Sequence, residues 1–312
     1  MRTTDGNAVR DDAGAASPAR PFPVVPGVAV EHTFVEARGL RFHVALAGPP
    51  DAPPLVLLHG WPQHWYVWRR VLPDLARDRR CVMPDLRGLG WSDAPRGGYE
   101  KQTLADDVLA LLDALDVGQT EFVGHDWGGW VGFLIALRRP ERLERLLALN
   151  IVPPWPPAST GRPQMRDALR LLRLAYQPLL ATPWLGEALV RRRRVMRALL
   201  RADTVHADAM PAAAVEQYTR ALAEPARARA SSLYYRDWLG KELVPFLRGR
   251  FSAGELSVPT HLLFGTQDAA LGPEPPEAVG AMTVEPVADS GHFIAEERPD
   301  LVAARAREFP RA

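Results

Sequence analysis

Residues 122–129 read FVGHDWGG, and the organisation of the chain can be worked out from this stretch outward. Residues 121–123 are predicted to form a strand, and residues 128–138 a helix that follows it almost directly. The glycines at 124, 128 and 129 permit a very tight turn between the two, and such a turn exposes its middle residue, Asp126, above the sheet. The stretch therefore predicts a strand–turn–helix unit with a carboxylate at the turn.

The rest of the chain, from about residue 28, alternates between strand and helix patterns. Strands are predicted at 32–37, 42–47, 55–58, 81–83, 146–149, 260–264 and 283–285, the first two as a hairpin. Further helices are predicted at 66–76, from a capping box at Thr103 to about residue 115, and at 299–309. This alternation predicts an α/β fold with an eight-stranded, mostly parallel sheet covered by helices.

The alternation is interrupted once. Prolines at 153, 154, 156 and 157 break the rhythm, and residues 165–239 have helical patterns without a strand signal. We therefore predict an α/β core made of residues 28–153 and 241–312, with a helical cap of residues 154–240 inserted into it. Residues 1–27, polar and rich in Gly and Ala at their start, are expected to form a flexible tail.

The composition excludes several classes of protein. The formal net charge is +1, from 38 basic and 37 acidic side chains, so neither nucleic acid nor an anionic membrane is expected as a partner. Only Lys101 and Lys241 are lysines, and we interpret the 36 arginines as a coding bias. The single cysteine, Cys81, is predicted to be buried, and no metal-binding motif occurs, so no metal or other cofactor is expected. Without an apolar run of about 18 residues or a secretory signal, the sequence predicts a cytoplasmic protein.

Three polar residues follow predicted strands in the order nucleophile, acid, base. Asp126 lies at the turn described above, Asp268 follows the strand at 260–264, and His292 follows the strand at 283–285. This order is typical of hydrolases with such a turn, which commonly have serine where this chain has Asp126. A carboxylate at that position can attack carbon and form an ester with the enzyme. Taken alone, Asp126 could instead be a helix N-cap, a position that Asp also favours.

The loop after the strand at 55–58 reads His59-Gly60-Trp61-Pro62. In hydrolases with this turn, that loop and the residue after the nucleophile each supply a backbone N–H to an oxyanion hole. Here the donors would be the amides of Trp61 and Trp127, which would stabilise a tetrahedral intermediate when an Asp126 ester is cleaved. A plain Gly-Pro loop is the alternative interpretation.

Together these motifs resemble the epoxide hydrolase branch of the α/β-hydrolase superfamily. The resemblance covers residues 28–310 and rests on HGWP at 59–62, PDLRGLGWS at 84–92, GHDWGG at 124–129 and GHF at 291–293. It implies the α/β-hydrolase fold and the opening of an epoxide to a vicinal diol. Asp126 would be the nucleophile, His292 and Asp268 would activate water, and Trp61, Trp127, His59 and Pro62 would contact the substrate.

The cap of that family presents two tyrosines that bind and protonate the epoxide oxygen. Tyr235, followed by an arginine as in the family's motif, matches the second tyrosine, and Tyr176 is similar to the first, with Tyr218 as the alternative. Any of the three could instead belong to the core. The chemistry is reasonable, because the alkoxide of an opened epoxide has a conjugate acid with a pKa near that of water, about 15.7, whereas a phenol has a pKa of about 10.

Two other functions remain open. Hydrolytic dehalogenation of haloalkanes or haloacids uses the same Asp–His–Asp machinery, and Trp127 could donate one N–H to a halide. A second halide donor is not evident, since Trp61 stands where one dehalogenase group has Asn. A non-catalytic binding protein is the third reading, which the complete triad disfavours. We expect a small apolar epoxide and water as substrates, with a monomer or a homodimer as the assembly.

Overall fold

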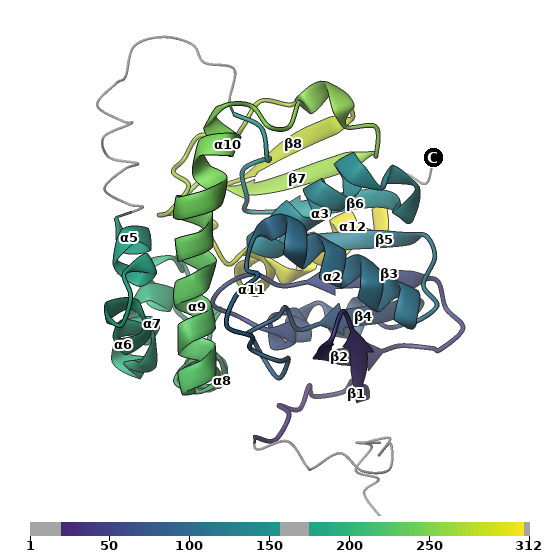
Figure 1. Ribbon diagram of the computed structural model, residues 1–312. Coiled ribbons are helices and arrows are strands. Elements are labelled where there is room, and N and C mark those ends of the chain that lie inside the picture. Colours follow the sequence, from purple (N-terminus) through teal and green to yellow (C-terminus); the bar gives the residue numbers. More distant parts are fainter. Residues whose placement is uncertain (1–19, 157–174, 309–312) are drawn as a thin grey trace, which may run out of the picture.

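The structure, a computed structural model, describes residues 20–156 and 175–308 and contains an eight-stranded sheet (Figure 1). The strand order is β1-β2-β4-β3-β5-β6-β7-β8. The β1–β2 and β2–β4 pairs are antiparallel, and every pair from β4–β3 to β7–β8 is parallel. The strands are β1 (Val30–Ala37), β2 (Leu40–Ala47), β3 (Pro54–Leu58), β4 (Arg80–Pro84), β5 (Thr120–His125), β6 (Leu143–Leu149), β7 (Thr260–Gly265) and β8 (Met282–Val287). The predicted α/β fold with a mostly parallel sheet is therefore confirmed.

Alternate residues of the central strands enter two separate hydrophobic cores. Phe122 and Leu146 pack in the core that includes α2 (Lys101–Ala114) and α3 (Trp127–Arg138). Their sequence neighbours Val123 and Leu147 pack in the core that includes η1 (Trp65–Arg70), α1 (Leu72–Leu75) and α12 (Pro299–Glu308). Because successive side chains of a strand point to opposite faces, these apolar runs suit strands that are buried on both sides.

Two predicted helices differ from the observed ones. The helix expected at 66–76 is divided into η1 and α1, because Pro73 in the first turn of α1 has no N–H with which to continue the preceding helix. Helix α2 begins two residues before its expected capping box, with Glu100 at the N-cap position. The free N–H of Lys101 donates instead to Glu242 Oε1, at 2.7 Å and 141 residues away. Tertiary structure therefore replaces the local cap.

Between β6 and β7, the described residues form helices only. They are α5 (Tyr176–Ala181), α6 (Leu185–Arg191), α7 (Arg193–Ala202), α8 (Ala212–Leu222), α9 (Pro225–Asp237), the π-helix η3 (Trp238–Glu242), α10 (Leu243–Leu247) and the short η4 (Ala253–Glu255). Figure 1 shows α5 to α9 gathered beside the sheet, with α9 as the longest of them. Residues 157–174 of the expected cap lie outside the described residues. No described helix is long and apolar enough to cross a membrane.

The part of the expected tail that the structure describes packs against the core. The Phe22 ring stacks on His32 with a centroid distance of 3.9 Å, and Arg20 lies over the ring of Trp91 and donates to the Gly90 carbonyl at 2.7 Å. Arg20 and Phe22, which fall within the expected tail, therefore have partners on the core. Residues 1–19 lie outside the described residues.

Candidate active site

Asp126 stands at the turn between β5 and α3, with a left-handed backbone φ of 52°. The chain approaches so closely here that only glycine fits at the neighbouring positions. A Cβ at Gly128 would lie 2.2 Å from the Leu58 carbonyl oxygen, and a Cβ at Gly60 would lie 2.3 Å from Asp126 Oδ1. The turn therefore brings the Asp126 side chain against the loop that follows β3.

Two backbone amides lie at the Asp126 carboxylate. The Trp61 N–H donates to Oδ1 at 2.8 Å. Burial raises the pKa of this carboxyl, and the Trp127 and Trp61 N–H groups act in the opposite direction. These are the two amides that the sequence predicted as oxyanion-hole donors, and the structure brings both to Asp126. Donors fixed in this way stabilise negative charge on a carboxylate oxygen without further reorganisation.

His292 connects Asp126 with Asp268. Its Nδ1 lies 2.8 Å from Asp268 Oδ2, and its Nε2 faces Asp126 Oδ2 at 3.7 Å. Asp268 follows β7 and His292 follows β8, so both reach the site from loops beyond the carboxyl ends of the parallel strands, where ligands of open α/β sheets usually bind. The three side chains predicted to form the triad therefore lie together.

Asn150, at the end of β6, supports the triad and was missed from the sequence. Its Nδ2 donates to Asp268 Oδ2 and to the Gly291 carbonyl, both at 2.9 Å, and its Oδ1 accepts the Gly265 N–H at 3.2 Å. The other oxygen of Asp268 accepts the amides of Ala270 and Leu271. The Asp268 carboxylate is thus fixed by three hydrogen-bond donors besides His292. The available signal was a polar residue that ends an apolar strand, as Asp126 does.

Charges at the site stabilise a proton on His292. Burial lowers the pKa of His292, but the carboxylates of Asp268, Asp126 and Asp203 outweigh it and raise that pKa to about 10. Burial raises the pKa of Asp268 by itself, but His292 and the hydrogen bonds hold it below the ordinary value. Asp203, which follows α7, also has a backbone carbonyl that accepts the His292 N–H at 3.0 Å, and burial raises the pKa of its carboxyl to about 6. The resting site therefore favours an imidazolium ion between carboxylates.

Tyr176 and Tyr235 form a hydrogen-bonded pair beside Asp126. Their rings meet edge to face at 5.7 Å, and their side chains are hydrogen-bonded to each other. The Trp61 ring contacts Tyr235 at a centroid distance of 4.9 Å. Burial raises the pKa of both phenols, and the Asp126 charge raises it further, so both stay protonated. Among the described tyrosines, only these two combine a pKa raised by the Asp126 charge with a hydrogen bond to each other.

Two of the sequence expectations need correction. His59 is fully buried, its Nδ1–H donates to the Gly60 carbonyl at 2.9 Å, and its Nε2 accepts the Leu86 N–H at 3.0 Å. Both ring nitrogens are hydrogen-bonded to backbone groups, so the ring fixes the loop after β3 and has no polar atom left to bind a substrate. Tyr218 is also fully buried and donates to Glu296 Oε1 at 2.7 Å, which removes it from the Tyr176–Tyr235 pair. Pro62 is buried beside Trp61, to which it is joined by a cis peptide bond.

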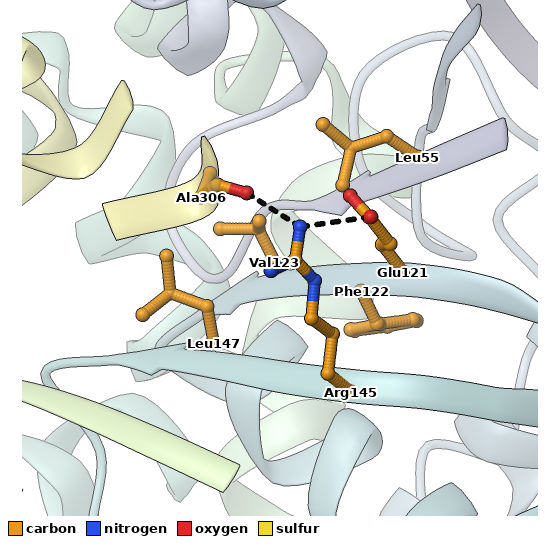
Figure 2. Close-up of a pocket in the computed structure, with 7 residues that line it drawn as sticks. All are labelled: Leu55, Glu121, Phe122, Val123, Arg145, Leu147 and Ala306. Atoms are coloured by element: carbon orange, nitrogen blue, oxygen red, sulfur yellow. Dashed lines mark hydrogen bonds and ion pairs between the residues drawn. The ribbon is translucent and has the colours of Figure 1, made fainter. Parts of the chain in front are cut away.

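The cavity in Figure 2 is separate from this site. It lies between β3, β5, β6 and α12, and within it Arg145 bonds the Glu121 carboxylate at 2.8 Å and the Ala306 carbonyl at 2.9 Å. Its volume of about 10 Å³ is at the lower limit for a single water molecule, so it is a packing gap. Among the described residues, no group of three or more His, Cys, Asp or Glu side chains could hold a metal ion.

Comparisons with known proteins agree with this geometry. The model of the alpha/beta hydrolase fold family matches residues 53–299. A soluble epoxide hydrolase from Corynebacterium sp. (strain C12) is 30% identical over 285 residues, which cover 90% of this chain and 97% of that protein. The structure of the epoxide hydrolase CorEH superposes with a TM-score of 0.76 at 29% identity, covering 90% of this chain and 98% of that one. A haloalkane dehalogenase variant from Bradyrhizobium elkanii shares the fold at 21% identity, with a TM-score of 0.70 and coverage of 88% and 94%.

Proposed function

The chain belongs to the α/β-hydrolase family, and on that premise we propose that it is an epoxide hydrolase that opens a small apolar epoxide to a vicinal diol through an ester on Asp126. The observation that carries the proposal is the Tyr176–Tyr235 pair beside the Asp126 carboxylate. To open a neutral three-membered ether, an enzyme requires a nucleophile that needs no base and a neutral group that can protonate the ring oxygen. Asp126 is such a nucleophile, and the two phenols are such proton donors. A halide leaving group needs no proton, so this pair favours the epoxide over the halide.

In the first half-reaction, Asp126 Oδ2 attacks a ring carbon. A C–O bond to the carboxylate forms as the C–O bond of the ring breaks, and the electron pair passes to the epoxide oxygen. That oxygen takes the proton of a tyrosine O–H. The phenols keep their protons until then because burial and the nearby Asp126 charge raise their pKa values. Substrate orientation follows from the aromatic walls of Trp61, Trp127 and Tyr235.

In the second half-reaction, water cleaves the ester. Once Asp126 is esterified its negative charge is lost, and one of the charges that raise the pKa of His292 is lost with it. The imidazole can then release its proton to the tyrosinate and act as the base for water. The oxygen of water adds to the ester carbon, and the charge on the carbonyl oxygen falls between the Trp61 and Trp127 amides. Collapse expels the diol oxygen, which takes the proton from His292, and the regenerated Asp126 carboxyl then gives its proton to the imidazole, which restores the resting imidazolium and carboxylate.

The test is the replacement of the base. In His292→Gln, the attack of Asp126 remains possible but hydrolysis stops, so the peptide that contains Asp126 should gain one substrate mass after a sub-stoichiometric burst. Intact-protein and peptide mass spectrometry would measure the adduct, with Asp126→Asn as the matched control that forms none. The wild-type panel should include aryl and alkyl epoxides, haloalkanes and haloacetates. Halide release without diol formation would replace the proposed substrate, and reaction of His292→Gln without any adduct would replace the ester mechanism.

A further inference from the structure

The two lysines of this chain meet at one contact. Arginine supplies 36 of the 38 basic side chains, yet Lys101 and Lys241 both lie where the start of α2 touches the π-helix η3. A coding bias toward arginine explains neither exception. The shared place of the only two lysines directs attention to this contact.

The contact is a crossed pair of ion pairs. Glu100 and Lys101 open α2, and Lys241 and Glu242 end η3, so each dipeptide presents one acid and one base. Lys101 Nζ lies 3.3 Å from Glu242 Oε2, and Lys241 Nζ pairs with Glu100. Glu242 also accepts the Lys101 backbone N–H at 2.7 Å. The π-helix, which is an uncommon element found mostly at functional sites, sets residues 241 and 242 in this position.

The two ion pairs differ in their surroundings. Lys241 is an exposed side chain, and its other partner is Asp237 at 2.8 Å. Lys101 is fully buried, and its ammonium lies 4.1 Å from the ring centroid of Trp127 and 3.4 Å from the Tyr234 carbonyl. A desolvated cation over an indole face is attracted electrostatically to the ring. Lys101 therefore holds the residue that follows Asp126.

A buried cation this close to the turn also acts on Asp126. Burial raises the pKa of Asp126 above its ordinary value, and His292, the Trp127 and Trp61 amides and the Lys101 ammonium all act in the opposite direction. The other titratable groups near this site are the carboxyls of Asp203 and Asp268 and the phenols of Tyr176, Tyr234 and Tyr235. The ammonium fits a space that a planar guanidinium, with its larger fork of donors, does not fill in the same way. Arginine would keep the charge but displace the indole.

We propose that Lys101 is a positioning residue for the epoxide reaction: it fixes the indole of Trp127 beneath the substrate and supplies positive charge that favours the attacking form of Asp126. This inference rests on the proposed function, and it adds a residue that does not touch the substrate. Its partner Glu242 ties the helix pair α9–η3, which carries Tyr235, to the same point. The ammonium thus couples the proton donor and the nucleophile to one anchor.

The test compares Lys101→Met, Lys101→Arg and the control Lys241→Met. The control removes the outer ion pair at the same contact but does not touch Trp127. We expect Lys101→Met to slow adduct formation by about 10–100-fold, as misplacement near the reacting atoms does, and to move the acid limb of its pH profile to higher pH. Lys101→Arg should slow the reaction without moving the acid limb as far. Lys241→Met should retain the wild-type profile.

A second readout does not depend on activity. In protein labelled with 5-fluorotryptophan, the ¹⁹F resonance of Trp127, assigned with Trp127→Phe, should move in Lys101→Met and stay in place in Lys241→Met. If Lys101→Met does not fold, Lys101→Met/Glu242→Gln removes both charges of this ion pair and takes its place. A wild-type rate, acid limb and Trp127 resonance in a folded variant would overturn the role of Lys101. Absence of diol and adduct in the wild type would overturn the proposed function instead, and the ¹⁹F result would still decide the positioning of Trp127.

Discussion

At the scale of the residue, the proposed mechanism gives Tyr176 and Tyr235 one shared task, the donation of a proton to the epoxide oxygen. Tyr235→Phe removes only an O–H, so we expect folding to be preserved and epoxide opening to slow by about 10²–10⁴-fold, the usual contribution of general acid catalysis. Because Tyr176 is hydrogen-bonded to Tyr235, each single variant should be milder than the double variant, which should be almost inactive. Single-turnover rates of ring opening would measure this. Additive effects of the two substitutions would mean that the phenols act independently.

The raised pKa of His292 predicts how the free energy of unfolding depends on pH. Its pKa rises from 6.5 in the unfolded chain to about 10 in the folded one, so the folded state binds its proton more tightly. The resulting stabilisation is fully present below pH 6.5 and is lost as the pH rises toward 10, with a slope of up to about 1.4 kcal/mol per pH unit. Urea unfolding of the wild type and of His292→Gln across this range would measure the difference. Parallel curves for the two proteins would contradict the ion-paired state of His292.

At the scale of the element, the close contact between the first turn of α3 and the end of β3 depends on Gly128. A Cβ there would lie 2.2 Å from the Leu58 carbonyl oxygen and 2.5 Å from that of His59, both rigid backbone atoms. Gly128→Ala should therefore destabilise the fold by about 1–3 kcal/mol or more, the cost of overpacking, and should displace Asp126. Gly97→Ala, at a position with no atom within 4 Å, is the matched control. Equal urea midpoints for the two variants would show that the turn relaxes freely.

The elements show what a sequence can and cannot predict. The central strands are apolar runs such as Leu55–Leu58, and burial on both faces makes that signal strong. The triad could be predicted because each member lies in the turn or loop that follows a strand, and all the parallel strands end at one edge. The start of α2 could not, because its cap comes from Glu242, far along the chain. Lys101 was missed for the same reason, since its partners are set by tertiary structure and leave no local pattern. Asn150 left only one local signal, a polar residue at the end of an apolar strand.

At the scale of the whole molecule, a buried polar junction joins the helices between β6 and β7 to the core. Glu296 of α11 (Ile294–Glu297) accepts a hydrogen bond from Tyr218 of α8. It also forms an ion pair with Arg69 of η1, whose Nη2 lies 2.6 Å from Glu296 Oε2. All three side chains are buried. Because removal of one partner leaves a buried charged group without its hydrogen bond, this junction contributes to how firmly α8 is held against the core.

Tyr218→Phe separates this structural role from the catalytic one. Loss of a hydrogen bond to a charged group should destabilise the protein by about 1.5–3 kcal/mol, measured as a lower urea midpoint. Tyr66→Phe, which removes a 3.3 Å bond to the exposed Val24 carbonyl, should cost less and serves as the control. The rate of ring opening per folded molecule should stay within a few-fold of the wild type in Tyr218→Phe, because its O–H is bound to Glu296 and not to the pair beside Asp126. If Tyr218→Phe remains folded but loses as much ring opening as Tyr235→Phe, Tyr218 would be a proton donor in place of Tyr176.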